Sequence, residues 1–142
     1  MNIINKQYKI FEKSHKNKIN QIIHVICSLL FVSCLNVLIF KGRFLFLYLL
    51  ILIFTSSILE SLSGIFIVYI ISFCILKLKL NATQLIIGVL LFYFIIPELS
   101  HLVTNEESLL DEFNILDSFI NFTHLLPFSL SVINNKKHTT PN

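Results

Sequence analysis

The residues of this 142-residue chain that could do chemistry are a few histidines and carboxylates, and the first group lies near the N-terminus. Asn20 and His24 are four residues apart, so they share one face of a helix, where an Asn amide can orient an imidazole ring. His15 and His24 are nine residues apart, which is about half a turn out of phase on a continuous helix. They can converge only if the chain bends between them, and Asn17-Lys18 offers such a bend.

Glu98 and His101 form a second candidate group, far along the chain. They are three residues apart and so face the same way on a helix, which Pro97 loosens just before them. Histidine nitrogens with one carboxylate are ligands that suit Fe(II), Zn(II) or Mn(II). A plain structural interpretation stays open, in which the N-terminal histidines are hydrated interfacial rings and Glu98 simply hydrogen-bonds His101.

Three further residues are weaker candidates. His124 lies about nine residues into an apolar stretch, where it is either a deep metal ligand or a histidine on an interfacial helix. Glu60 falls at a predicted turn, where a solvated charge needs no special role, so it is a reserve ligand at most. His138 stands in a polar tail, and we assign it no function.

The elements that must position these residues are strongly apolar. Hydrophobic residues make up 55% of the chain and charged residues 13%, about half the charged share of a soluble domain. A soluble protein of this size could not bury so much apolar surface, which excludes an ordinary cytosolic globule and a disordered chain. The three cysteines, Cys27, Cys34 and Cys74, all lie in apolar runs, which argues against a disulfide framework. A membrane protein remains.

Four apolar runs have lengths near that of a membrane-spanning helix. They cover residues 21–40, 44–59, 62–78 and 82–103. Backbone groups cannot stay unpaired in lipid and the runs lack an alternation of period two, so we expect helices and not a barrel. A fifth stretch, 115–133, carries polar residues and is spanning, re-entrant or interfacial.

We therefore predict an all-α fold, a polytopic membrane bundle of four transmembrane helices with a fifth, polar-faced helix. Residues 1–18 are expected to form an N-terminal interfacial amphipathic segment with a helix over residues 3–14. Residues 19–133 would form the membrane helix bundle, and residues 134–142 a polar tail.

The loops between the runs are tight, so neighbouring spans should be antiparallel. This arrangement brings His15, His24 and His101 near the same membrane face. Lysines gather in the N-terminal segment with no Arg among them and no interleaved aromatic platform. That pattern favours anionic lipid headgroups as partners and speaks against nucleic acid.

Several of these residues stand in an order that is found elsewhere. His15, Asn20 and His24 precede an apolar span, and Phe11 comes shortly before them. Three short stretches follow near the other end: Glu98-Leu99-Ser100-His101, Ser108-Leu109-Leu110-Asp111 and Leu125-Leu126-Pro127-Phe128. This order resembles the small membrane family of 2-hydroxy fatty acid dioxygenases, which act in fatty acid α-oxidation and phytosphingosine breakdown. The resemblance covers about residues 6–133.

The resemblance implies a non-haem iron enzyme of the endoplasmic reticulum membrane, or of the inner membrane in a bacterium. Such an enzyme uses O₂ to shorten a long-chain 2-hydroxy fatty acid by one carbon. The implied catalytic residues and ligands of Fe²⁺ are His15, His24 and His101, with His124 as a further candidate ligand. The residues expected to support this iron site are Asn20, Asp111 and Glu98. Where the family has a Glu four residues after the later His, this chain has Asn105, and Glu106 follows one step on.

Other functions remain open on the sequence. The chain could be a small transporter or proton-relay protein that uses the histidines and Glu98 as its pathway. It could also be a membrane scaffold whose histidines only satisfy one another, or an inactive relative of the dioxygenases. The sequence does not decide whether the chain forms an oligomer.

Overall fold

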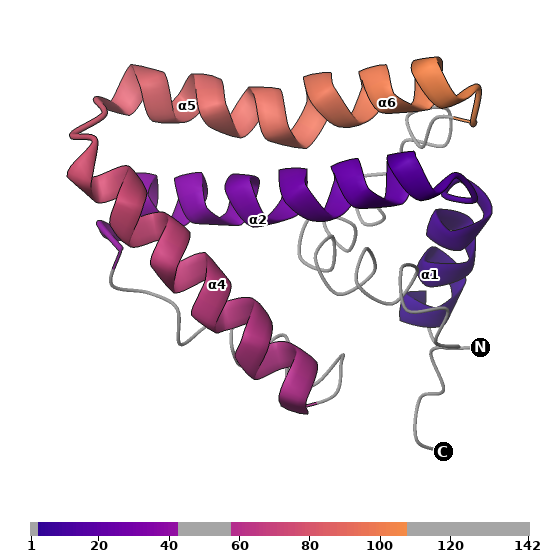
Figure 1. The fold of residues 1–142 in the computed structure, drawn as a ribbon, viewed down its shortest axis with the longest axis horizontal. Helices are drawn as coiled ribbons and strands as arrows, with labels where there is room; N and C mark the ends of the chain where they lie inside the picture. Colours follow the sequence, from indigo (N-terminus) through magenta and orange to yellow (C-terminus); the bar gives the residue numbers. More distant parts are fainter. Residues whose placement is uncertain (1–2, 43–57, 108–142) are drawn as a thin grey trace.

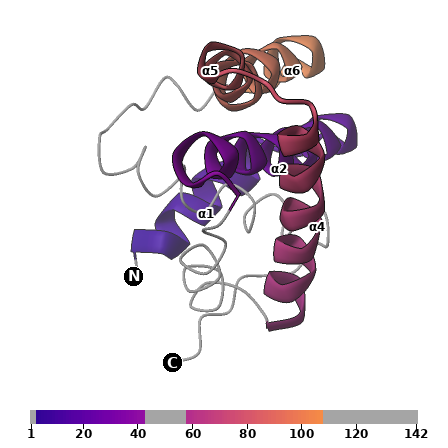
Figure 2. The same cartoon turned by 90° about the vertical axis from the view of Figure 1, so that its left-hand side faces the viewer.

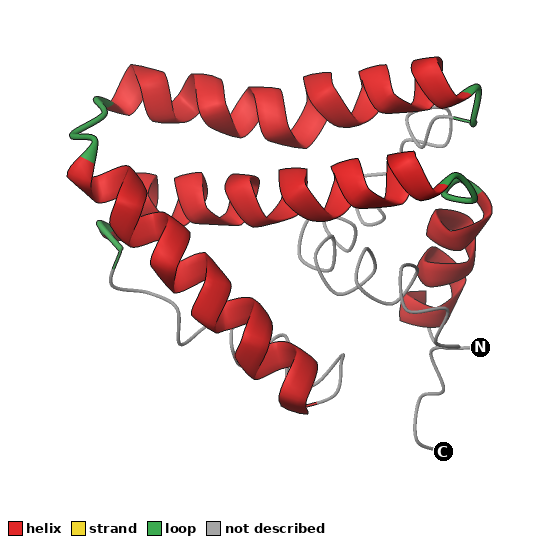
Figure 3. Ribbon diagram, in the orientation of Figure 1, coloured by secondary structure: helices red, strands yellow, loops and turns green. Residues whose placement is uncertain are grey.

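The computed structural model describes residues 3–42 and 58–107. Every regular element in these two ranges is helical (Figure 3). The elements are α1 (Ile3–Lys13), α2 (Lys18–Phe40), α4 (Ile58–Lys77), α5 (Ala82–Leu90), the π-helical turn η1 (Leu91–Ile95) and α6 (Ile96–Thr104). The last three follow one another without a break and make one long rod that runs alongside α2 (Figure 1).

The central element is α2, because α4, α5, η1 and α6 all pack against it. Helix α1 descends from the N-terminal end of α2, on the side of α2 away from α5 and α6 (Figure 1). Helix α4 descends from the start of α5 past α2 (Figure 2). The fold thus gathers the turn before α2 and the end of α6 at one end of the molecule.

The ends of α2 are set by local hydrogen bonds. At its start, the Asn17 side chain accepts a hydrogen bond from the backbone N–H of Ile19 at 2.8 Å, which satisfies one of the free N–H groups of the first turn. At its end, Lys41 and Gly42 both adopt positive φ, 49° and 79°. The N–H of Gly42 then reaches back to the carbonyl of Asn36 at 3.2 Å, so the helix stops there.

The rod begins at a capping box and changes register in its middle. Asn81 and Gln84 exchange hydrogen bonds between side chain and backbone, each at 2.9 Å, at the start of α5. Further on, Pro97 has no N–H to give to the carbonyl four residues before it. The π-helical turn stands just ahead of this proline, and the N–H of Ile96 bonds Leu91. The extra residue of this turn rotates α6 relative to α5 and so decides which α6 side chains face α2.

Apolar contacts and a few polar ones hold α2 to its neighbours. Cys34 and Val37 of α2 meet Ile75 of α4 and Leu85 of α5 in a buried cluster. At Gly88 an added Cβ would lie 3.2 Å from the sulfur of Cys34, so the glycine lets α5 approach α2 closely.

Hydrogen bonds connect the same face of α2 to α4. The Asn36 amide donates to Ser72 Oγ at 3.1 Å, and Ser33 Oγ donates to the carbonyl of Val68 at 3.4 Å. Such bonds satisfy polar side chains inside an otherwise apolar helix pair.

Two of the four predicted membrane spans correspond to helices that could cross a membrane by their length and composition. Lys18–Phe40 and Ala82–Thr104 are long and apolar enough to cross a membrane. The predicted run 62–78 is helical, but its apolar part, Gly64–Lys77, is shorter than a span. The predicted second run, 44–59, lies almost wholly outside the described residues, and the fifth, 115–133, lies entirely outside them.

The predicted N-terminal helix and the turn after it are both present. The expected helix over residues 3–14 is α1, and the expected turn after it separates α1 from α2. Lys6 and Lys9 are exposed on this helix, whereas Phe11 is buried. Glu60, which the sequence placed at a turn, lies instead inside α4, because that helix begins at Ile58.

We expect Gly42→Ala to lower the free energy of unfolding by about 1 kcal/mol or more, because a non-glycine residue is strained at this positive φ. A Cβ at this position would also meet Leu76 Cδ1 at 2.7 Å. Denaturant unfolding of the detergent-solubilised protein, followed by far-UV circular dichroism, measures the change. Lys41→Gly is the matched control in the same turn, and it should leave the stability unchanged or raise it. Equal stability of Gly42→Ala and wild type would contradict the strain argument.

Candidate metal centre

Three histidines from three parts of the fold converge at the end of the molecule where α6 stops. His15 stands in the turn between α1 and α2, His24 in the second turn of α2, and His101 in α6. All three are buried, with exposed fractions of 1%, 4% and 3%. The ring centroids of His15 and His24 are 4.1 Å apart. The centroid of His101 lies 4.8 Å from that of His15 and 5.1 Å from that of His24. One ring nitrogen from each histidine lies within 4.8 Å of the others, so the three could hold a metal ion.

The ring of His15 is oriented by Phe11, one turn earlier. The two rings stack with centroids 3.8 Å apart and an interplanar angle of 11°. His15 Nδ1 lies 2.6 Å from the Phe11 carbonyl oxygen, which can only accept, so Nδ1 carries the proton. The lone pair is then on Nε2, which is the arrangement that metal-ligating histidines generally have.

His24 is held without any hydrogen bond to its ring. Neither of its nitrogens has a partner among the described residues, and the same is true of His15 Nε2. Buried polar atoms without partners are rare, because each costs its full desolvation. Three such nitrogens on adjacent rings mark a place that a ligand would satisfy, and neutral imidazole nitrogens are good ligands for a divalent transition metal.

Asn20 connects the third histidine to its surroundings. Its side chain is fully buried, and its Nδ2 donates to Glu106 Oε2 at 2.6 Å and lies 3.3 Å from His101 Nδ1. Its Oδ1 accepts a hydrogen bond from Ser100 Oγ. Asn20 therefore contacts His101 and not His24, whose helix face it shares, because its amide points across to α6.

Glu106 joins the end of α6 to the turn before α2. Its Oε1 accepts the backbone N–H groups of Lys16 at 2.5 Å and Asn17 at 2.8 Å. Burial alone would raise the pKa of Glu106, but the hydrogen bonds from Asn20, from these two N–H groups and from Thr104 outweigh burial and lower it. The side chain is thus a carboxylate at neutral pH, and it lies at the positive end of the α2 dipole.

The residue before Glu106 makes this contact possible. Asn105 has a φ of 56°, the left-handed conformation that ends many helices. Its N–H bonds the carbonyl of Leu102 at 3.4 Å, and the N–H of Glu106 bonds the carbonyl of His101 at 3.0 Å. This is a Schellman turn, and it directs the chain back toward α2.

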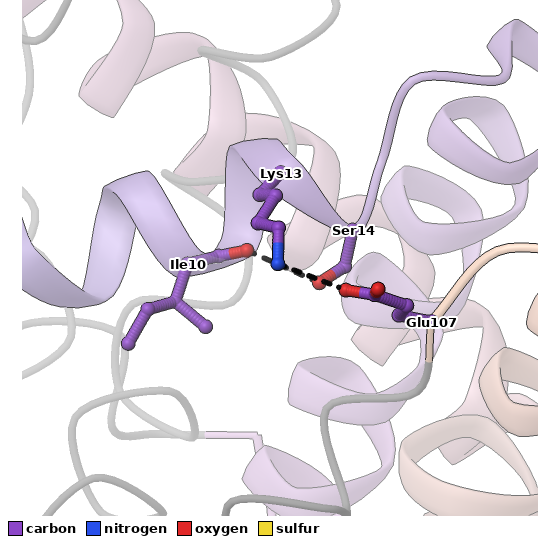
Figure 4. A network of polar contacts seen from close by, with 4 residues as sticks. All are labelled: Ile10, Lys13, Ser14 and Glu107. Atoms are coloured by element: carbon purple, nitrogen blue, oxygen red, sulfur yellow. Dashed lines mark hydrogen bonds and ion pairs between the residues drawn. The ribbon is translucent and has the colours of Figure 1, made fainter.

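A second, exposed connection follows directly after. Lys13 Nζ and Glu107 Oε2 form an ion pair at 3.1 Å, next to the hydrogen bond at 3.1 Å from Ser14 Oγ to the carbonyl of Ile10 (Figure 4). The side chains of the pair are 69% and 73% exposed, so it contributes little to stability. It nevertheless joins the end of α1 to the segment after α6.

The structure brings together the three histidines that the sequence singled out, through the expected bend before α2. Glu98 is half-buried on α6 and interacts electrostatically with His101. Asp111 and His124 lie outside the described residues.

Sequence reasoning missed the part that Glu106 plays, since it treated this residue as a displaced family position. The signal that could have found it is Asn105, a residue type that readily ends a helix in the left-handed conformation.

The comparisons with known proteins add nothing to this geometry. No protein-family model matches the chain, and the searches of curated proteins and of solved structures found no relative.

The burial of His15 predicts a pH dependence of stability. Burial lowers the pKa of this ring from 6.5 to about 3, although the hydrogen bond to Phe11 acts in the opposite direction. Between these two values the unfolded chain binds one more proton at this position than the folded chain. Stability should therefore fall as the pH falls from about 6.5 toward 3, by about 1 kcal/mol per pH unit from this ring.

The variant His15→Gln removes this titration. We expect its unfolding free energy, measured by denaturant titration at several pH values, to depend on pH less steeply than that of the wild type by this amount. Equal slopes would show that His15 titrates as it does in the unfolded chain.

Proposed function

We propose that this protein is a non-haem Fe(II)-dependent dioxygenase that shortens long-chain 2-hydroxy fatty acids by one carbon at a membrane interface. The observation that carries the proposal is the buried cluster of His15, His24 and His101, with unpartnered ring nitrogens, at the end of two apolar helices. The resemblance of the sequence to the dioxygenase family points to the same three residues.

The ligand set suits a metal that must bind other molecules. The cluster offers three neutral nitrogens and no carboxylate within the described ranges, so most coordination positions would stay open for O₂ and substrate. Iron bound there would supply the one-electron chemistry that O₂ requires. The protein would hold the histidines in place, keep them neutral by burial and exclude bulk water.

The reaction balances without a further reductant. In a 2-hydroxy acid R–CH(OH)–COOH the bond between C1 and C2 breaks, C1 leaves as CO₂ and C2 becomes the carboxyl carbon of R–COOH. With one O₂ the other product is one H₂O. The oxidation of C1 releases one electron and that of C2 three, which together reduce O₂ by four electrons. No other redox cofactor is needed beside the metal.

The placement of the cluster fits a substrate with a polar head and an apolar tail. The outer faces of the helices expose large apolar side chains, among them Ile19, Ile22 and Ile26 on α2, which suit contact with lipid tails. Lys16 and Lys18 are exposed in the turn next to the histidines and at the start of α2, where they would attract the carboxylate of the substrate. We place the enzyme in the endoplasmic reticulum membrane, or in the inner membrane of a bacterium.

We expect the detergent-purified protein, prepared anaerobically with Fe(II), to contain close to one iron per chain by elemental analysis. His15→Ala, His24→Ala and His101→Ala should each lose it, because two nitrogens hold iron far less well than three. His138→Ala, a histidine of the polar tail, is the matched control and should keep the iron. A folded, metal-free wild type would favour a scaffold or a proton relay over an enzyme.

A turnover assay tests the proposed substrate and reaction. A 2-hydroxy fatty acid with ¹⁸O₂ should give the acid one carbon shorter, labelled with ¹⁸O, and one CO₂ per O₂ consumed without added reductant. Protein loaded with Zn(II), which has no redox chemistry, should be inactive, and the histidine variants should lose at least about 100-fold in rate. Iron retention without oxygen uptake would overturn the dioxygenase proposal while leaving the metal site intact.

A further inference from the structure

The amide of Asn20 can face only one way with the neighbours that it has in this structure. Glu106 Oε2 lies 2.6 Å from Asn20 Nδ2, and an ionised carboxylate only accepts hydrogen bonds. On the other side, Asn20 Oδ1 accepts from Ser100 Oγ. Turning the amide over would place its oxygen against the carboxylate of Glu106, which is unfavourable in this half-buried contact.

This orientation decides where His101 carries its proton. The same Asn20 Nδ2 lies 3.3 Å from His101 Nδ1, so Nδ1 faces a donor and must accept. A neutral imidazole has one N–H, and in His101 it is therefore on Nε2. His15 has the opposite tautomer, because its Nδ1 donates to the carbonyl of Phe11 at 2.6 Å.

The tautomer of His101 conflicts with metal binding, whichever nitrogen is used. A metal on Nε2 moves the proton to Nδ1, where it would meet the NH₂ group of Asn20. A metal on Nδ1 displaces Asn20 directly. His15 needs no such change, because its Nε2 is already free of a proton.

With a proton on His101 Nδ1, the Asn20 amide would find new partners after turning over. Asn20 Oδ1 would accept the new N–H of His101, and Asn20 Nδ2 would face Ser100 Oγ, whose own hydrogen can reach the carbonyl of Pro97 at 2.7 Å. The bond to Glu106 Oε2 would be lost, and Asn20 Oδ1 would face that carboxylate oxygen in its place. Glu106 Oε1 would keep the backbone N–H groups of Lys16 and Asn17, so the contact between α6 and the turn before α2 would survive.

We propose that Glu106 is a positioning residue that acts through Asn20 to hold His101 in the Nε2–H tautomer, and that metal binding through His101 Nε2 turns the Asn20 amide over. The proposal rests on the metal site of the proposed function, but it does not depend on iron, O₂ or any substrate. In this proposal Glu106 lowers the affinity of the site for metal and also joins the end of α6 to the turn before α2.

The variant Glu106→Gln separates these two roles. A Gln side chain keeps an oxygen for the backbone N–H groups and adds an NH₂ that can donate to the turned-over Asn20. Metal binding should therefore become tighter, by about tenfold for one relieved mismatch. Glu106→Ala removes the contact as well and should bind metal more weakly than the wild type. Glu107→Gln, the neighbouring carboxylate that pairs with Lys13, is the matched control and should behave as wild type.

The test uses full-length protein in detergent with ¹⁵N-labelled imidazole rings. Metal-free wild type should show His101, assigned by loss of its signals in His101→Gln, with the proton on Nε2, and Glu106→Gln should show a mixture of tautomers. Titration with Zn(II), a diamagnetic probe, should move the His101 proton to Nδ1 and shift the side-chain amide signals of Asn20. Zinc affinities of the three variants come from the same titrations.

Three results would overturn the proposal: a proton on Nδ1 of His101 in the metal-free wild type, no zinc binding by the wild type, or zinc binding that Glu106→Gln weakens as much as Glu106→Ala. A residue with only a structural role would give the third result and leave the tautomer unchanged. Loss of dioxygenase activity has no bearing on any of these readouts, so the failure of the proposed function and the failure of this inference are distinguishable.

Discussion

The carboxylate of Glu106 is the contact on which the arrangement of the histidines depends. It accepts hydrogen bonds from the backbone of the turn before α2 and from the buried amide of Asn20. One ionised side chain thus satisfies donors from two elements at the place where the ends of α2 and α6 meet. Charge-assisted hydrogen bonds of this kind are about twice as strong as neutral ones. With this contact in place, the turn that carries His15 is held against the helix that carries His101.

The same end of the molecule holds most of the buried side-chain atoms that lack a hydrogen-bond partner among the described residues, and each of them costs free energy. Three neutral histidines are buried against one another, and three of their nitrogens have no partner among the described residues. A ligand that binds only the folded chain would offset this cost and add its binding free energy to the stability. The stacking of His15 on Phe11 and the α2 backbone hold the rings of His15 and His24 in place. Buried polar atoms that lack hydrogen-bond partners are typical of a functional site.

The lengths of the apolar runs and the helical repeat gave most of what the sequence could predict. The runs placed α2 and the α5–α6 rod within a few residues, and the repeat showed that His15 and His24 could meet only through a bend. Periodicity assigns residues to a face of one helix, however, and does not say which neighbour faces them. The amide of Asn20 shares its face with His24 and yet bonds His101.

Two backbone features explain the rest of what sequence reasoning missed. The π-helical turn ahead of Pro97 shifts the register of α6 by one residue, so a straight-helix projection misplaces the residues beyond it. The left-handed Asn105 then turns the chain so that Glu106, and not the residue four positions after His101, reaches α2. Both features depend on hydrogen bonds that form only when the helices pack. A sequence pattern can suggest where they occur, but not which side chain they bring to the site.

The distribution of unsatisfied polar atoms shows that the open cluster is not a general property of this fold. Polar side chains also lie along the buried face of α2 farther from the histidines, and there Ser28, Ser33 and Asn36 each make at least one hydrogen bond. Ser28 and Ser33 donate to backbone carbonyls, and the Asn36 amide donates to Ser72. Of the four buried side-chain atoms without a partner in the described ranges, three belong to His15 and His24, and the fourth is Asn36 Oδ1. A helix that bonds most of its polar groups along its length and gathers unpartnered ring nitrogens at one end could hold a metal ion there, because burial selects against such atoms unless a ligand pairs with them.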